Sequence, residues 1–121
     1  MVEFIEIGGK QRPILYGNAA FKMLKDRKGF GLMRFLDELS TGDPDVVSDI
    51  TYCALRVGER AEKMPPSEDF KEEMDVAVWI DLYPGGVQAI MNLIVKSLPK
   101  APAEGGEGEP GEAKASGTGT T

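Results

Sequence analysis

The stretch that decides the fold is DPDVVSDITYCALRVGERA, residues 43–61. It opens with Asp43, a good N-cap residue, and with Pro44, which suits the first helical position because its missing N–H is not needed there. Apolar side chains then recur at Val46, Val47, Ile50, Ala54, Val57 and Ala61. This apolar stripe is wider than a surface helix needs, so we predict a central helix that is covered on two sides.

Two more helices are predicted on the C-terminal side of this stretch. The sequence MPPS at residues 64–67 is a breaker followed by a cap, and Glu68 and Asp69 would lie in the first turn of the next helix. That helix carries Phe70, Met74, Ala77 and Val78 and stops at YPGG, residues 83–86. The last helix has the cleanest amphipathic pattern of the chain, with apolar residues at Val87, Ile90, Met91, Ile94, Val95 and Leu98.

On the N-terminal side, the pattern predicts a hairpin and two helices. VEFIEI (2–7) and QRPILYG (11–17) flank a Gly8-Gly9 turn, and Pro13 favours a short or edge second strand. Asn18 is the expected N-cap of a helix that ends near Gly29. A short helix follows, with an apolar stripe at Leu32, Met33, Phe35, Leu36 and Leu39. The predicted fold class is α+β, mostly α, with an N-terminal β-hairpin followed by a bundle of about five helices.

The composition changes after residue 98. Residues 99–121 contain no aromatic or branched aliphatic residue and are dominated by Gly, Pro, Ala and Glu. Such a segment buries too little apolar surface to offset the entropy of ordering it. We therefore expect residues 1–98 to form the folded domain and residues 99–121 to be a disordered tail or linker.

The composition argues against catalysis and against nucleic acid binding. The 121 residues include no histidine and one cysteine, and the net charge is −6. The usual general base and zinc ligand are therefore missing, and a phosphate backbone would be repelled. Cys53 lies among apolar residues and is expected to be a small buried hydrophobe rather than a reactive thiol. We expect no catalytic, cofactor-binding or metal-binding residue, and a carboxylate-dependent enzyme is the least favoured alternative.

Several charged or glycine-rich motifs have ordinary structural explanations. Lys22, Lys25, Arg27 and Lys28 are expected to form a solvated face and a helix C-terminus. Gly8-Gly9 lacks the further residues of a nucleotide-binding loop, and the acids at positions 43, 45 and 49 lack the glycine and glutamate of a calcium loop. No apolar run approaches the ~20 residues that span a bilayer, and no secretory signal is visible. We expect an intracellular protein without a membrane partner.

Trp79 and Leu93 are the two candidates for a partner surface. Both are more simply interpreted as core residues, but large apolar side chains are also typical anchors of protein interfaces. The six methionines suit an adaptable surface, although we expect most of them in the core.

The order of these signals resembles one protein family. Ile5 to Tyr16 resembles an opening I-x-I-G-G-K segment, and Ile50, Tyr52, Ala54, Leu55 and Gly58 are a loosened small-residue patch. Ser67, Glu68 and Phe70 resemble the start of a later helix. The chain is thus similar, over residues 3–98, to the tail assembly chaperones of long-tailed bacteriophages and prophages, although Arg56 to Glu59 and the prolines after Met64 depart from the pattern.

The resemblance implies a non-enzymatic helper that acts in the host cell cytoplasm. Such proteins keep the tape measure protein soluble, help to recruit tail tube subunits, and are absent from the mature virion. Many are also made in a frameshifted longer form that binds the major tail tube protein, and the tail at 99–121 would suit a linker to it. A homo-oligomer is a further expectation. The alternative is a structural tail-completion or connector protein that stays in the particle.

Overall fold

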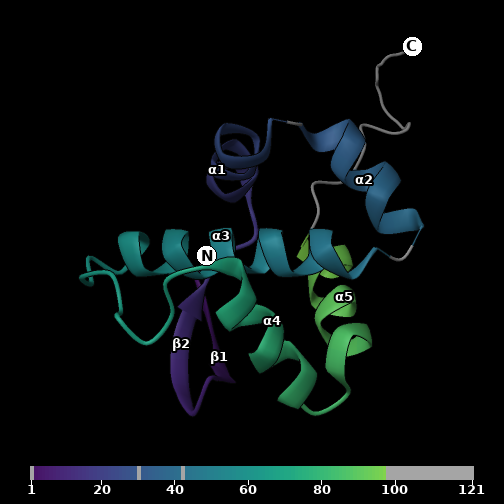
Figure 1. The fold of residues 1–121 in the computed structure, drawn as a ribbon. Coiled ribbons are helices and arrows are strands. Elements are labelled where there is room, and N and C mark those ends of the chain that lie inside the picture. The colour runs from purple at the N-terminus through teal and green to yellow at the C-terminus, as the bar shows by residue number, and fades with distance from the viewer. Residues whose placement is uncertain (1, 30, 42, 98–121) are drawn as a thin grey trace.

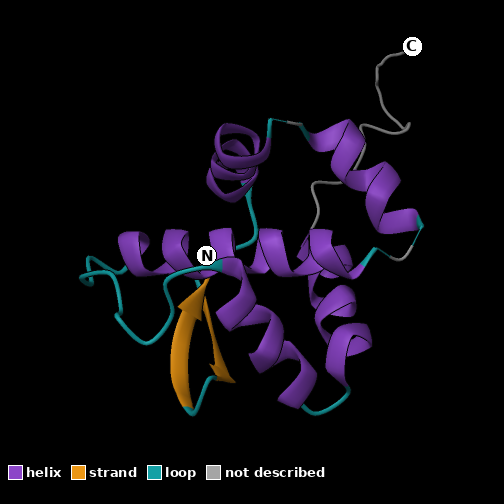
Figure 2. Ribbon diagram, in the orientation of Figure 1, coloured by secondary structure: helices purple, strands orange, loops and turns teal. Residues whose placement is uncertain are grey.

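The computed structural model describes residues 2–29, 31–41 and 43–97, which form a hairpin followed by five helices (Figures 1 and 2). The predicted α+β, mostly α class is therefore confirmed. In chain order the elements are β1 (Glu3–Ile7), β2 (Lys10–Ile14), α1 (Asn18–Lys28), α2 (Leu32–Ser40), α3 (Pro44–Ala61), α4 (Glu73–Leu82) and α5 (Gly86–Ser97).

Helix α3 is the centre of the fold, as residues 43–61 predict. Asp43 caps it by accepting a hydrogen bond from the Asp45 N–H at 2.9 Å, and Pro44 is its first residue. Figure 1 shows α1 and α2 on one side of α3, with the hairpin, α4 and α5 on the other. The apolar stripe is buried between these two layers except at Ala61, which is exposed because the helix ends beyond the hairpin.

The hairpin turns at Gly8 and Gly9, whose φ angles of 64° and 87° lie in the left-handed region that glycine tolerates. The two strands are antiparallel, and Ile7 pairs with Lys10 while Phe4 pairs with Pro13. Both strands are shorter than predicted. Ile5 and Ile7 face the core, whereas Phe4 and Glu6 face outward.

Two helix starts differ from the predictions. Gly17, not Asn18, is the N-cap of α1, and no side chain caps that helix. Helix α4 begins at Glu73, so Glu68 and Asp69 lie in the preceding loop rather than in a first helical turn. The Asp75 carboxylate caps the N-terminus of α4: it accepts hydrogen bonds from the N–H groups of Lys71 at 2.7 Å and Glu72 at 3.2 Å.

The apolar face of α5 is also rotated from the prediction. Ile90 and Ile94 are buried, but Val95 is 57% exposed, while Leu93 is half-buried against the core. The face of α5 that packs against the core therefore includes Leu93 and excludes Val95.

The expectation that most methionines lie in the core is wrong for the described residues. Met33, Met64 and Met74 are exposed, and Met23 and Met91 are only partly buried. On α2, Phe35 and Leu39 suffice to reach the core, so Met33 is left at the surface.

The structure does not test the predicted tail, and it bears only in part on the expectation that the chain does not span a membrane. The predicted tail at 99–121 lies outside the described residues. In the part of the chain that is described, no single helix is long and apolar enough to cross a membrane; α4 and α5, bent by 109°, pass that test only as a pair and only by length and composition.

Candidate protein interaction surface

Trp79 forms one wall of a hollow beside the hairpin turn. Its ring lies 4.4 Å from the Arg12 guanidinium and is edge-on to Phe70 at 5.3 Å between centroids. A Cβ added at Gly8 would lie 2.5 Å from the indole, so the turn and the ring are in close contact. The hollow measures about 610 Å³ and continues over Leu82, Tyr83 and Pro84. Trp79 is therefore half-buried, with one part in the core and one part lining a surface hollow.

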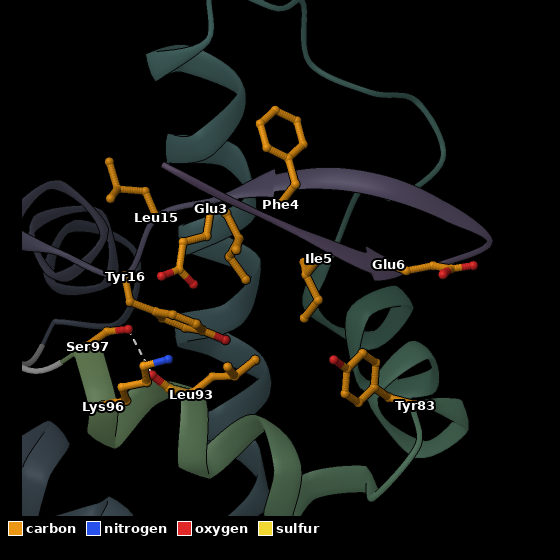
Figure 3. Close-up of a pocket in the computed structure, with 11 residues that line it drawn as sticks. Glu3, Phe4, Ile5, Glu6, Leu15, Tyr16, Tyr83, Leu93, Lys96 and Ser97 are labelled. Atoms are coloured by element: carbon orange, nitrogen blue, oxygen red, sulfur yellow. Dashed lines mark hydrogen bonds between the residues drawn. The ribbon is translucent and has the colours of Figure 1, made fainter. Parts of the chain in front are cut away.

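Leu93 lines a second hollow, of about 440 Å³, between β1 and the end of α5 (Figure 3). Tyr16 lies at its inner side and exchanges a 2.8 Å hydrogen bond with Thr51. Burial raises the pKa of Tyr16 far above its ordinary value, although the Thr51 bond opposes the shift. Tyr16 is thus a neutral, fixed part of the wall, and Leu93 lies partly against the core and partly along this hollow.

The two hollows are neighbours, since both are lined by Glu6 and Tyr83. The structure therefore places Trp79 and Leu93 in adjacent hollows along the same strand, β1, rather than in a single pocket. Two elements far apart in sequence, the hairpin and the α4–α5 corner, form the two sides of this groove.

Sequence analysis missed the most exposed apolar feature, which is a row along α4. Met74, Val78 and Leu82 follow one another at four-residue spacing and are 67%, 49% and 78% exposed. Seven of the ten α4 residues are apolar, and Val76 and Ile80 already supply the contacts with the core. A helix that is apolar all round is normally covered on all sides. That signal was available in the sequence EMDVAVWIDL, but only the structure shows which side is left uncovered.

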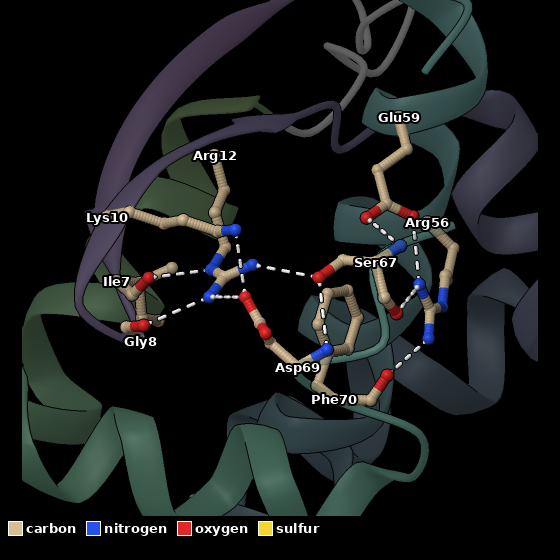
Figure 4. A network of polar contacts seen from close by, with 9 residues as sticks. All are labelled: Ile7, Gly8, Lys10, Arg12, Arg56, Glu59, Ser67, Asp69 and Phe70. Atoms are coloured by element: carbon tan, nitrogen blue, oxygen red, sulfur yellow. Dashed lines mark hydrogen bonds and ion pairs between the residues drawn. The ribbon is translucent and has the colours of Figure 1, made fainter. Parts of the chain in front are cut away.

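A polar network fixes the loop that leads into α4 (Figure 4). Arg12, which is buried, donates to Ile7 O at 2.8 Å, to Gly8 O at 3.0 Å and to Asp69 at 3.0 Å. Hydrogen bonds from Lys10 and Arg12 hold the pKa of Asp69 below its ordinary value. The loop is thereby tied to the hairpin.

A second arginine ties the same loop to α3. Arg56 donates to Ser67 O at 3.0 Å and to Phe70 O, and it pairs with Glu59 at 3.0 Å. Glu59 in turn accepts the Ser67 N–H at 2.9 Å. Phe70 is held in the core from a loop rather than from a helix, which explains why the helical spacing at Phe70 was misleading.

The basic residues of α1 are more than the solvated face that was predicted. Arg27 forms an ion pair with Glu73 and lies 4.6 Å from the Tyr52 ring, and Lys28 lies 3.7 Å from the same carboxylate. Burial opposes ionisation of Glu73, but the Arg27 hydrogen bond and the two cations outweigh it, so the pKa of Glu73 is lowered. Lys22 remains at the surface in a local pair with Asp26.

The described residues contain no group of three or more His, Cys, Asp or Glu residues that could hold a metal ion. Cys53 is fully buried, as predicted, and burial raises its pKa to about 12. Its thiol is therefore protonated at neutral pH and is a poor nucleophile.

Comparison of the chain with protein-family models, with curated proteins and with solved structures gives no match.

Proposed function

We propose that this protein is a non-enzymatic tail assembly chaperone that binds an apolar face of the tape measure protein and keeps it soluble. The observation that carries the proposal is the exposed row Met74, Val78 and Leu82 on α4. The choice of the tape measure protein as the client rests on the motif resemblance over residues 3–98. The row supplies a surface that a chaperone for an apolar helix needs.

The shape of the row favours a helical client. From Met74 to Leu82 it covers just over two turns, about 12 Å of helix axis. Apolar side chains at such spacing pack against the i, i+4, i+7 positions of an amphipathic helix. Asp81 lies on the same outer side, and the whole chain carries a net charge of −6, so basic residues beside the client's apolar stripe would be favoured.

The further parts of the proposal follow from the resemblance alone. The protein acts in the host cell cytoplasm, helps to recruit the major tail tube protein, possesses a frameshifted longer form for that step, and leaves before the virion is complete. No enzymatic activity, nucleic acid or membrane is involved.

Co-expression with the tape measure protein tests the proposal. The wild-type chain is expected to give a soluble complex, and the double variant Met74→Gln/Leu82→Gln is expected to bind at least roughly tenfold more weakly, because two exposed anchors are lost. Glutamine is a good helix former, so the fold should be preserved. The measurement is the amount of client recovered in the soluble complex, together with the dissociation constant.

The matched control is Met33→Gln/Val95→Gln, which removes two exposed apolar side chains from α2 and α5. It should leave binding unchanged. A client that stays insoluble with the wild-type chain would refute the chaperone function, and equal losses in both double variants would refute the α4 site. Detection of the chain by mass spectrometry in purified virions would favour the structural tail protein instead.

A further inference from the structure

The two outer edges of the hairpin are in different situations. The hairpin has a two-residue turn, and Ile7 and Lys10 form the hydrogen-bonded pair next to it. Along each strand, every second residue therefore points its N–H and C=O groups away from the partner strand. At the Pro13 end of the β2 side these groups face α3: Leu15 N–H donates to Ala54 O at 3.1 Å, and the Pro13 carbonyl lies against Gly58. That end of the β2 edge is covered.

The β1 edge is not covered. Phe4 and Glu6 are the residues whose N–H and C=O groups point away from β2, and none of these groups has a hydrogen-bond partner among the described residues. A row of unpaired strand groups is a template for another strand. Phe4 also presents an exposed ring at this edge.

A groove lies along the same edge. The hollow at Leu93 borders β1 from Glu3 to Glu6 (Figure 3), and the hollow at Trp79 borders the end of the strand and the turn from Glu6 to Gly9. The opposite wall is apolar or aromatic at Leu82, Tyr83 and Leu93. The edge thus offers backbone hydrogen bonds beside apolar hollows, which is the combination that strand addition uses.

We propose that the β1 edge binds an extended segment of a partner protein in which apolar residues alternate with lysine or arginine. The segment adds a third strand beside Phe4 and Glu6. Its apolar side chains enter the hollows at Trp79 and Leu93, and its basic side chains, which point to the opposite face of the strand, lie near Glu6. This proposal goes beyond the chaperone function, and its surface shares with the α4 row only Leu82, which ends the row and lines the hollow at Trp79.

The charge at the β1 edge favours a basic segment over two other possible occupants, a second copy of the chain and the chain's own residues 98–121. Glu3 and Glu6 border the edge, against the single cation Lys96 on the far wall. A second copy paired through β1 would bring four carboxylates into one small sheet. The chain's own residues 98–121 carry four glutamates against two lysines, so they would also be repelled. A basic segment is attracted instead.

The probe is a short capped peptide of alternating valine and lysine, titrated into the full chain at physiological salt. Trp79 is the only tryptophan and lines the groove, so its fluorescence reports binding. Amide hydrogen exchange measured by NMR should slow at Phe4 and Glu6 on binding. It should change little at Ile5, which already pairs with Arg12.

Two control peptides separate strand pairing from charge. The same peptide with alternate backbone nitrogens methylated keeps its charge but loses donors, and it should bind roughly tenfold or more weakly. A valine–glutamate peptide should not bind. Equal binding of the methylated and unmethylated peptides, or unchanged exchange at Phe4 and Glu6, would overturn the proposal.

A protein variant provides the matching test. Phe4→Pro removes the outward N–H without breaking the ladder, just as Pro13 is accommodated directly opposite, while Phe4→Ala removes only the ring. We expect Phe4→Pro to abolish peptide binding and Phe4→Ala to retain it in part. Circular dichroism checks the fold, and the methylated peptide decides the question on the wild-type chain if Phe4→Pro unfolds. A concentration-dependent dimer that Phe4→Pro abolishes would overturn the proposal in favour of a second copy.

Discussion

At the scale of single residues, Gly58 sets the distance between the central helix and the hairpin. A Cβ built on it would lie 2.5 Å from the Pro13 carbonyl oxygen and 2.6 Å from the carbonyl carbon. Both atoms belong to the backbone, which cannot rotate away as a side chain could. The small-residue position that the family resemblance singled out at Gly58 thus has a physical reason in this chain, namely the direct contact of α3 with β2.

Gly58→Ala should therefore destabilise the protein although alanine is the better helix former. Overpacking against backbone typically costs about 1–3 kcal/mol, which exceeds the gain of about 1 kcal/mol in helix propensity. The measurement is the free energy of unfolding in urea. Gly17→Ala is the control for the steric effect, because nothing lies within 4 Å of a Cβ there, and any loss that it shows measures the N-cap preference for glycine over alanine. A Gly58→Ala chain that is more stable than wild type would show that the close approach is not rigid.

At the scale of elements, α4 shows where local sequence patterns stop being informative. Its start is set by Asp75 and by a loop that Arg12 and Arg56 tie to the hairpin and to α3. The carboxylate of Glu73 also joins α4 to Arg27 of α1. Two of these contacts span long stretches of sequence: Arg12 and Asp69 are 57 positions apart, and Arg27 and Glu73 are 46 apart. Spacing within the helix cannot reveal them.

The Glu73 ion pair should make the stability of the protein depend on pH. Because the folded-state pKa of Glu73 is lowered, its contribution is present above the unfolded-state pKa of about 4.3 and is lost as the pH falls through the folded value. Glu73→Gln should cost about 1 kcal/mol of unfolding free energy at neutral pH and progressively less in acid. Urea titrations at several pH values measure this.

The control for this prediction is Glu68→Gln, which neutralises an exposed acid in the loop before α4. It should leave the free energy of unfolding at neutral pH nearly unchanged, because the Glu68 side chain is exposed. A constant difference between Glu73→Gln and wild type at all pH values would contradict the ion-pair explanation.

At the scale of the whole molecule, the central helix α3 holds the other elements together. Helix α3 contacts α1, α2, α4, α5 and β2, and the buried residues form one continuous core. The hairpin alone would be marginal in water, so its stability comes from α3 and from the Arg12 network. The exposed row on α4 and the free edge of β1 are two places where this packing leaves apolar or hydrogen-bonding surface uncovered.

This arrangement predicts a single cooperative unfolding transition. Trp79 fluorescence, which reports the hairpin and α4, and far-ultraviolet circular dichroism, which reports all helices, should give the same urea midpoint. A fluorescence transition at a clearly lower urea concentration would show that the hairpin and α4 open before the rest.

Residues 43–61 by themselves determined the central helix, because a cap, a proline at the first position and a wide apolar stripe are local properties. The glycines at 8 and 9 determined the hairpin for the same reason, and the burial of Cys53 followed from its neighbours. Only the tertiary structure decided that Phe70 reaches the core from a loop, that Val95 faces outward and Leu93 inward, and that Met74, Val78 and Leu82 are left uncovered. The apolar character of a residue says only that burial of its side chain is favourable. Which apolar residues are buried depends on neighbours that are far away in the sequence. The same holds for the edge of β1, which stays open because no other element of the described fold covers it.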